Sequence, residues 1–351
     1  MWWLTPEYGT LMAVEFIEEE EQVSSDRGTS KVAEVQNLRV TFATSAGVAS
    51  AVRGISFSIE RGESVGLVGE SGSGKSVTAL SLMKLLPQRG VRIEADRLVV
   101  MGTEIMAAGA RELQELRGGR VAMVLQNPLR SLNPTRRIGV QIAETIRKHE
   151  NLSAREVKSK VVELLGRVGI PEPERRAREY PHQFSGGQRQ RIMIAIAIAC
   201  SPGLLIADEP TTALDVTTQA QIFDLILDLR AEFGMAILLI THDLSVVARV
   251  CDRVLVMYAG RLIETASAIE MFRRPLHPYT SGLLAAIPRI DQPDREIKPI
   301  RGTPLDATER VEGCAFRARC PHSFELCSSQ PALDLVTPDH LVACWRSRDG
   351  W

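Results

Sequence analysis

Apolar residues gather in short runs, and stretches with helical spacing separate these runs. Near the start, two runs show the alternation of half-buried strands: Val35, Leu38, Val40 and Phe42, then Val52, Ile55, Phe57 and Ile59. Three later runs, 64–68, 204–207 and 236–240, are almost wholly apolar, as in parallel strands that are buried on both faces. This order predicts an α/β fold with a mostly parallel sheet.

Two helices can be predicted from local signals. Ser153 and Glu156 have the spacing of a capping box, and Gly169 followed by Pro171 marks the end of the helix that begins there. The apolar residues on one face of this helix are Val157, Val161, Leu164, Leu165 and Val168. A second helical run, 77–86, directly follows a glycine-rich stretch.

Residues 1–31 differ in composition from the rest. Glu18 to Glu21 form an acidic run and 24–30 are mostly small and polar, so little apolar surface is present to offset the entropy lost on ordering. We expect a flexible acidic tail, or residues added by expression or by a misassigned start. Order is expected to begin near Val32.

The composition is that of a globular protein and excludes several classes. The 351 residues include 42 basic and 43 acidic side chains, and this balance argues against a general polyanion binder. The longest apolar run, 192–200, is too short to span a bilayer, and the first residues do not resemble a secretion signal. In a cytoplasmic chain, the six cysteines are expected to be thiols or ligands rather than disulfides.

The most informative segment lies between the predicted strand 64–68 and the helical run 77–86. It matches G-x-x-x-x-G-K-[ST] with the residues Gly69, Glu70, Ser71, Gly72, Ser73, Gly74, Lys75 and Ser76. The backbone N–H groups of such a loop surround phosphate at a helix N-terminus. Lys75 would neutralise the β- and γ-phosphates, and Ser76 would bind Mg²⁺. A purely structural glycine turn is the alternative.

Two carboxylates follow the predicted strand 204–207. Asp208 and Glu209 stand at its C-terminal end, where ligands bind in open α/β sheets. We expect Asp208 to hold Mg²⁺ and Glu209 to orient or deprotonate the attacking water, with helix capping as the alternative. A simple core needs far fewer residues between Lys75 and Asp208 than this chain has. A mainly helical insert is therefore expected at about 103–200.

A second loop of phosphate-binding type lies at 184–188. It places Ser185, Gly186, Gly187 and Gln188 at the start of an apolar helical stretch. Because one nucleotide rarely needs two such loops from one chain, we expect this loop to contact a nucleotide held by another subunit.

These motifs closely resemble those of the ATP-binding-cassette (ABC) superfamily. They are Walker A at 69–76, the Q-loop residue Gln126, the signature at 184–188, Walker B at 204–209, the D-loop at 213–215 and the switch residue His242. The resemblance implies a P-loop NTPase (RecA-like) core with an N-terminal antiparallel β-subdomain, a helical insert and a small Cys-containing C-terminal extension. The ABC domain would occupy 32–275 and the extension 276–351.

The resemblance also implies a head-to-tail dimer in which each ATP lies between one subunit's phosphate loop and the other's signature. Ser185 and Gly187 would then contact the γ-phosphate across the interface. His242 would contact the γ-phosphate and the attacking water, and Gln126 would link Mg²⁺ to movement of the insert. The remaining expected nucleotide contacts are Val77, Gly186, Gln188 and Asp215, with Phe42 either stacking on adenine or serving as a core strand residue.

Further segments resemble the oligopeptide/dipeptide permease branch of this superfamily. They are 127–134, 180–183, 277–280, 283–288 and 302–304. The resemblance implies an ATP-hydrolysing subunit of a peptide importer at the cytoplasmic face of the membrane. Its expected partners are a second ATPase subunit (a copy or a paralogue), two transmembrane permeases and an extracellular or periplasmic solute-binding protein, with no nucleic acid. The alternatives are a nickel or other small-solute importer, a soluble ABC ATPase acting on ribosomes or DNA, and a non-catalytic regulatory subunit.

Four cysteines crowd the C-terminal region, in the spacing C-x5-C-x6-C-x16-C: Cys314, Cys320, Cys327 and Cys344. Four thiolates suit a tetrahedral metal or an iron–sulfur cluster, and the absence of closely spaced pairs favours iron over zinc. Arg317, Arg319 and Arg346 could offset the cluster's negative charge. The resemblance implies a [4Fe–4S] cluster, with zinc, unligated thiols and disulfides as alternatives. Cys200 and Cys251 are expected in the core.

Overall fold

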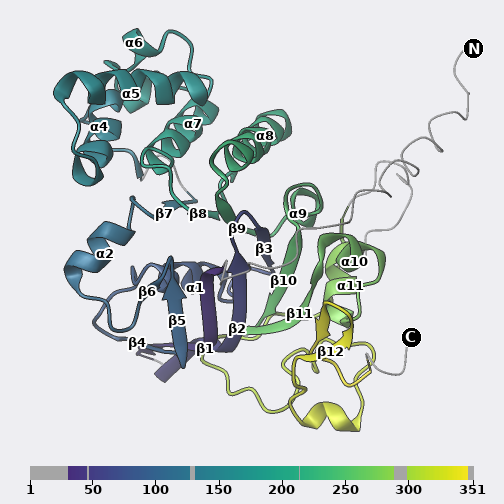
Figure 1. Ribbon diagram of the computed structural model, residues 1–351. Coiled ribbons are helices and arrows are strands. Elements are labelled where there is room, and N and C mark those ends of the chain that lie inside the picture. Colours follow the sequence, from purple (N-terminus) through teal and green to yellow (C-terminus); the bar gives the residue numbers. More distant parts are fainter. Residues whose placement is uncertain (1–30, 46, 127–130, 213, 288–298, 347–351) are drawn as a thin grey trace, which may run out of the picture. The chain divides into compact units, whose positions relative to one another are not determined.

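Two long antiparallel strands open the described part of the chain, β1 (Lys31–Thr44) and β2 (Gly47–Glu60). A computed structural model of the chain describes residues 31–45, 47–126, 131–212, 214–287 and 299–346 (Figure 1). The predicted tail, apart from Lys31, lies outside these ranges, as do the segment 127–130, Ala213 and Pro288 of the motifs. Both strands extend beyond the apolar runs that predicted them, because backbone pairing between them continues where side chains are exposed.

The first sheet is antiparallel throughout its described strands. β1 pairs with β2 on one side. On its other side it pairs with β4 (Val91–Glu94) and β5 (Arg97–Val100), and the short β6 (Thr103–Glu104) pairs with β5. The predicted hairpin near the start of the chain therefore belongs to a five-stranded sheet.

The second sheet contains the parallel strands that the sequence predicted. Its order is β12-β13-β11-β10-β3-β9-β8-β7, and the strands from β10 to β7 are parallel. These five are β3 (Ser64–Val68), β7 (Val121–Val124), β8 (Leu204–Asp208), β9 (Ala236–Thr241) and β10 (Arg253–Tyr258). β11 (Arg261–Ser267), β12 (Asp334–Thr337) and β13 (His340–Val342) add antiparallel strands at one edge.

Successive residues of the central strands face two different hydrophobic cores. In β8, Leu205 and Ala207 pack with the helices, whereas Leu204 and Ile206 pack with α1 and the first sheet. All four side chains are fully buried. A strand covered on both faces needs apolar side chains at every position, which explains the unbroken apolar runs in the sequence.

Helices lie between and beside the strands. They are α1 (Lys75–Leu82), α2 (Ala110–Leu116), α4 (Ile138–His149), α5 (Ala154–Arg167), α6 (Pro173–Arg176), α7 (Gly186–Ala197), α8 (Val216–Phe233), α9 (Leu244–Val250), α10 (Ala268–Arg273) and α11 (Pro278–Ala285). Short 3-10 turns occur at Pro181–Gln183 and Glu325–Ser328. Ser153 caps α5 through the predicted capping box, since its Oγ accepts from Glu156 N at 3.3 Å.

The helix after the glycine-rich loop is shorter at its C-terminus than predicted. It was expected over 77–86, but α1 ends at Leu82 because Lys84 adopts a left-handed conformation (φ 49°). Lys84 N donates to Ser81 O and Leu85 N donates to Leu80 O, so the end is a Schellman motif. Because this position holds a lysine where glycine is usual, no residue in the sequence marked the end of the helix.

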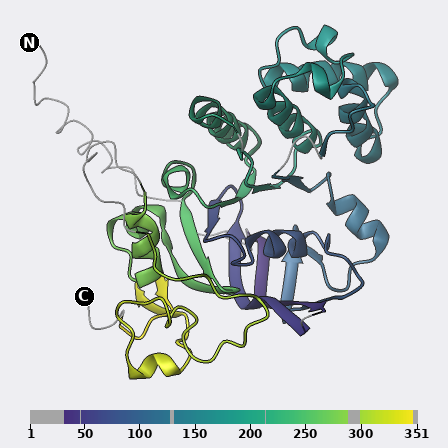
Figure 2. The ribbon, with the colours of Figure 1, turned by 180° about the vertical axis from the view of Figure 1, so that it is seen from behind.

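Helices α4 to α7 form a group beside the second sheet, and α7 contacts β7 of that sheet (Figures 1 and 2). Ile142 of α4, Val161 of α5 and Ile192 of α7 pack together in its core. The predicted insert at 103–200 also contains β6 and β7, which belong to the two sheets. Helices α4 to α7 all follow β7.

The C-terminal region continues the main sheet. β13 pairs with β11, and the fully buried Glu264 of β11 lies 2.8 Å from His340 of β13 (Glu264 Oε1 to His340 Nε2). The Glu264 carboxylate also accepts from the backbone N–H groups of Leu276 and His277 at the start of α11. These contacts join the C-terminal extension that was predicted from the sequence to the core.

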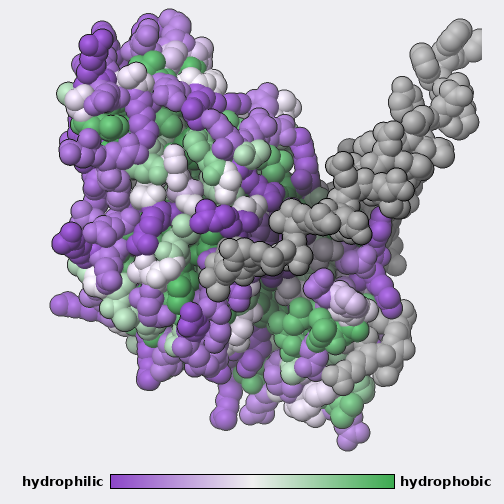
Figure 3. Space-filling model, viewed as in Figure 1, coloured by the Kyte–Doolittle hydropathy of each residue, from purple (hydrophilic) through white to green (hydrophobic). Residues whose placement is uncertain are grey.

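No helix in the described ranges has the length and apolar character needed to cross a bilayer. Hydrophilic side chains predominate on the face of the molecule shown in Figure 3.

Candidate active site

The glycine-rich loop connects β3 to α1 with a backbone that only glycine fits at two positions. Gly69 has φ 152° and Gly74 has φ 104°. A Cβ on Gly69 would lie 2.1 Å from Met257 O, and one on Gly74 would lie 2.3 Å from Ala51 O. No side chain caps α1, so the N–H groups of its first turn are available to an anion.

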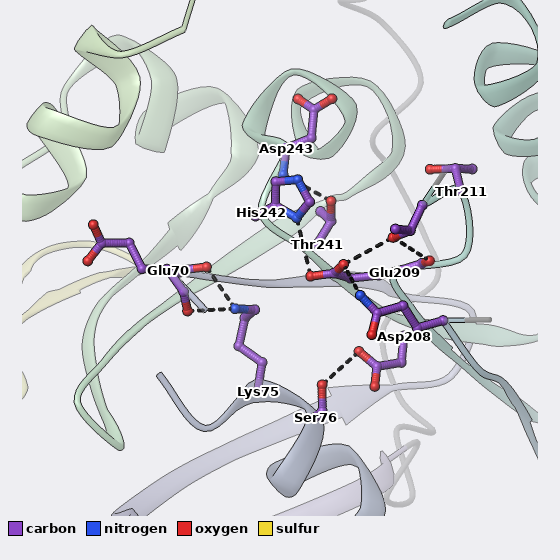
Figure 4. Close-up of polar contacts among 12 residues, drawn as sticks. Glu70, Lys75, Ser76, Asp208, Glu209, Thr211, Thr241, His242 and Asp243 are labelled. Atoms are coloured by element: carbon purple, nitrogen blue, oxygen red, sulfur yellow. Dashed lines mark hydrogen bonds and ion pairs between the residues drawn. The ribbon is translucent and has the colours of Figure 1, made fainter. Parts of the chain in front are cut away.

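Lys75 points into this loop. Its Nζ donates to the carbonyl oxygens of Gly69 (2.7 Å) and Glu70 (2.9 Å), and the side chain is buried (Figure 4). Burial lowers the pKa of Lys75, while the carboxylates of Glu209, Asp208 and Glu70 act to raise it. Two neutral carbonyls compensate a buried cation poorly, so the site favours a negatively charged ligand.

The hydroxyl of the residue after Lys75 is hydrogen-bonded to a carboxylate. Ser76 Oγ donates to Asp208 Oδ1 at 3.0 Å, and Asp208 is buried at the end of β8. Burial raises the pKa of Asp208, and the neighbouring Glu209 adds to this effect. A bound cation would relieve both costs, and two hard oxygen donors are the ligands that Mg²⁺ prefers. The predicted metal pair is thus brought together.

Glu209 has an uncommon backbone conformation and several partners. It follows β8 with φ 46°, in the left-handed region, and its N–H donates to Ile240 O in β9. Its Oε2 accepts from Gln126 Nε2 at 2.6 Å and from Thr212 Oγ1 at 3.0 Å. Its Oε1 lies 3.2 Å from His242 Nδ1. Such strain persists only where surrounding contacts fix it, as they do at functional sites.

These contacts keep Glu209 ionised. Burial acts to raise its pKa, but hydrogen bonds from His242, Thr212 and Gln126 outweigh burial and hold the pKa below its usual value. At neutral pH, Glu209 is therefore a carboxylate that can accept a proton or orient water. His242 remains two-thirds exposed and so is accessible to a ligand.

The structure brings together most of the predicted catalytic residues. Lys75, Ser76, Asp208, Glu209 and His242 come from the ends of three adjacent parallel strands, β3, β8 and β9, and converge in Figure 4. Gln126, after β7, contacts Glu209 and is not hydrogen-bonded to the Ser76–Asp208 pair. Thr212 was missed, because a threonine three residues after a carboxylate has no distinctive pattern.

The second phosphate-type loop stands at the start of another helix. Ser185 caps α7: its Oγ accepts from Gln188 N, and Gln188 Oε1 accepts from Ser185 N. A Cβ at Gly186 would lie 3.4 Å from Leu214 Cδ2, and one at Gly187 would lie 2.7 Å from Thr218 Cγ2, near the start of α8. Within the described residues, no hydrogen bond joins this loop to residues 69–76.

Two further predicted residues have structural partners in this chain. Asp215 caps α8, accepting from Thr218 N at 2.9 Å. Phe42 in β1 is partly buried and packs against the core shared with the first sheet. Their nucleotide contacts stay predictions.

The four C-terminal cysteines line a single pocket, together with Phe316, Phe324 and Trp345 among others. Burial and the neighbouring thiols raise the pKa of Cys314 to about 11. All six cysteines lie in the described ranges, and no disulfide joins any of them. As arranged, no three His, Cys, Asp or Glu side chains in the described residues form a group able to hold a metal ion. The predicted cluster is therefore not shown.

One expectation for this region is wrong. Arg346 lines the thiol pocket and stacks on Phe324, but Arg319 points elsewhere and pairs with Glu70 of the glycine-rich loop. The sequence placed Arg319 with the cysteines because it precedes Cys320. Its true partner is far away in the chain, and no local pattern indicates it.

Two protein families match the chain. The family described as ABC transporter matches residues 52–212, and the family described as oligopeptide/dipeptide transporter, C-terminal region, matches 263–327.

The chain is also similar to curated proteins over most of its length. It is 49% identical to the oligopeptide transport ATP-binding protein OppD of Escherichia coli over 89% of this chain and 92% of that protein. It is 45% identical to the dipeptide transport ATP-binding protein DppD of Bacillus subtilis over 90% of this chain and 94% of that one. Among solved structures, a dimeric ATP-binding cassette in a post-hydrolysis state, bound to ADP and Pi, matches with a TM-score of 0.60 and 28% identity, covering 67% of this chain and 98% of that one.

Proposed function

We propose a function from the premise that this chain belongs to the ABC transporter family, in the branch of oligopeptide and dipeptide transport ATP-binding proteins. The chain is an ATPase subunit of a peptide ABC importer and hydrolyses ATP to ADP and phosphate. The observation that carries the ATPase assignment is the Glu209 carboxylate, held by Gln126, Thr212 and His242 beside the Ser76–Asp208 pair.

Each residue of the site has a separate role in phosphoryl transfer. Lys75 and the N-terminus of α1 neutralise the phosphates, and Ser76 with Asp208 would hold Mg²⁺. Glu209 orients the attacking water and accepts its proton, while His242 fixes the carboxylate. Because the transition state is largely dissociative, positioning and charge compensation supply most of the catalysis. ATP itself supplies the phosphoryl group that is transferred.

Replacing Lys75 with alanine tests the ATP site. We expect the affinity of the purified chain for Mg-ATP to fall by about 10- to 100-fold, because the buried cation that contacts the phosphates is lost. Equilibrium titration with a fluorescent ATP analogue measures the change. Lys158→Ala, on the exposed side of α5, is the control and should bind like wild type. Equal affinity of Lys75→Ala and wild type would contradict the assignment.

The transport assembly is part of the proposal. ATP hydrolysis moves a solute only through a pathway across the membrane, so the chain would work with permease subunits, a second ATPase and a solute-binding protein at the cytoplasmic membrane surface. The names of the relatives support di- or oligopeptides as cargo. We place the nucleotide-binding domain at 32–275 and the C-terminal region at 276–351. Recovery of integral membrane proteins with the native complex would support this assignment, and recovery of ribosomes or DNA alone would oppose it.

We also propose that the C-terminal thiol pocket takes a [4Fe–4S] cluster. The support is that all four thiols line one pocket and that Arg346 lies beside them. A [4Fe–4S] cluster takes four thiolate ligands, the number of thiols that line this pocket. Its charge would be offset by Arg346.

Anaerobic purification tests the cluster. We expect a brown protein with about four iron atoms per chain, since all four thiolates are ligands. Cys327→Ser should lose colour and iron, whereas Cys251→Ser, in the core directly after α9, should keep both. A colourless protein with stoichiometric zinc would replace the cluster by a zinc site, and a metal-free protein would leave only thiols.

A further inference from the structure

A partly buried ion pair joins the C-terminal region to the glycine-rich loop. Arg319 Nη1 donates to Glu70 Oε2 at 2.6 Å and Arg319 Nη2 donates to Glu70 Oε1 at 2.9 Å, so the contact is bidentate. The Arg319 side chain is 5% exposed and that of Glu70 is 26% exposed. Charge-assisted, bidentate pairs of this kind fix geometry as well as charge.

The same region also holds the backbone of Glu70. Glu70 N donates to Tyr279 Oη at 2.8 Å. Arg319 in turn lies over the rings of Tyr258 and Phe316 and donates to Arg301 O, and the three rings of Tyr258, Tyr279 and Phe316 pack against one another. Rigid packing on these rings leaves Arg319 little freedom to follow Glu70 if the loop moves.

Glu70 faces the ATP site on its other side. Its carbonyl oxygen accepts from Lys75 Nζ, whereas its carboxylate points away from Lys75 (Figure 4). The charge of Glu70 nevertheless acts on Lys75, since it is among the groups that raise the pKa of that lysine. An uncompensated carboxylate here would repel the phosphates that Lys75 attracts.

We propose that Arg319 and Tyr279 are positioning residues of the phosphate loop: they hold Glu70 in place and cancel its charge, which makes the C-terminal region a part of the ATP site. This inference rests on the proposed ATPase function and deepens it. The segment that carries the thiol pocket would thereby set nucleotide affinity, because Arg319 directly precedes Cys320 in the chain.

A purely structural role of Arg319 predicts a different result from a role in cancelling the charge of Glu70. If Arg319 only anchors the C-terminal region, then removing Glu70 as well cannot repair its loss. If Arg319 cancels the charge of Glu70, then Arg319→Gln harms binding because a carboxylate is left alone, and adding Glu70→Gln removes that carboxylate. The double-mutant cycle separates the two.

The experiment measures the Kd of the purified full chain for a fluorescent ATP analogue with Mg²⁺, alongside Tm. Arg319→Gln is expected to weaken binding about tenfold, a change of about 1.4 kcal/mol. The Glu70→Gln/Arg319→Gln pair should recover most of the loss. Arg319→Lys, which keeps the charge without the fork, should fall between wild type and Arg319→Gln. Arg310→Gln, in an exposed pair with Glu312 of the same region, is the control and should match wild type.

Each outcome decides the inference. Wild-type affinity in Arg319→Gln overturns it, and so does a folded double variant that binds as weakly as Arg319→Gln. Should Arg319→Gln prove unfolded by Tm, the comparison passes to Arg319→Lys with and without Glu70→Gln, with the same expected recovery. Failure of wild type to bind the ATP analogue would instead overturn the proposed function, so the two failures are distinguishable.

Discussion

Replacement of Glu209 by glutamine is expected to lower the kcat of the assembled complex for ATP hydrolysis by at least about 100-fold, with ATP binding retained. Glutamine keeps the shape of the side chain but cannot accept a proton from water. The pKa of Glu209 lies below its usual value because of its hydrogen bonds, so wild type has the base fully formed at neutral pH. Steady-state phosphate release and ATP-analogue titration measure kcat and binding separately.

The matched control for this variant is Glu312→Gln, which removes a carboxylate that is largely exposed in the C-terminal region. It should leave kcat and binding unchanged. Turnover by Glu209→Gln within about twofold of wild type would exclude Glu209 as the base and would favour the regulatory alternative. If the variant lost both ATP binding and turnover, the substitution would instead have disturbed the strained backbone at Glu209.

Local sequence carried most of the information about the active site. Only glycine fits at Gly69 and Gly74, because a Cβ atom there would collide with a backbone oxygen. This requirement appears in the sequence as a recognisable motif. The strands β3, β8 and β9 were predicted because both of their faces are buried, which forces continuous apolar runs. The convergence of Lys75, Asp208 and His242 follows from parallel strands that end at one edge.

Contacts between distant segments could not be predicted in this way. The Arg319–Glu70 pair and the Glu264–His340 contact join residues that are far apart in sequence, and neither arginine nor histidine has a spacing that reveals its partner. The sequence predicted a C-terminal extension but did not indicate that one of its strands, β13, extends the main sheet. The early end of α1 was missed for a related reason, since Lys84 takes a conformation that usually identifies glycine.

We propose that the signature loop of a second ATPase chain completes the reaction chamber of this one. Ser185 is hydrogen-bonded within its own helix start, and in the described residues nothing joins it to the phosphate loop. A site built from one subunit's Lys75 and another's Ser185 uses both anion-binding helix starts on the same nucleotide.

Replacing Ser185 with arginine should therefore separate binding from turnover. We expect ATP affinity of the isolated chain to stay within about twofold of wild type, because Lys75 and α1 are intact, while hydrolysis falls by about 100-fold or more since the γ-phosphate loses its second set of donors. Arg155→Ala in α5 serves as an exposed control. In wild type, phosphate release per chain should also rise with protein concentration, because pairing is required. Full-rate turnover at dilutions where the chain is monomeric would contradict the shared site, and so would weak ATP binding by a folded Ser185→Arg.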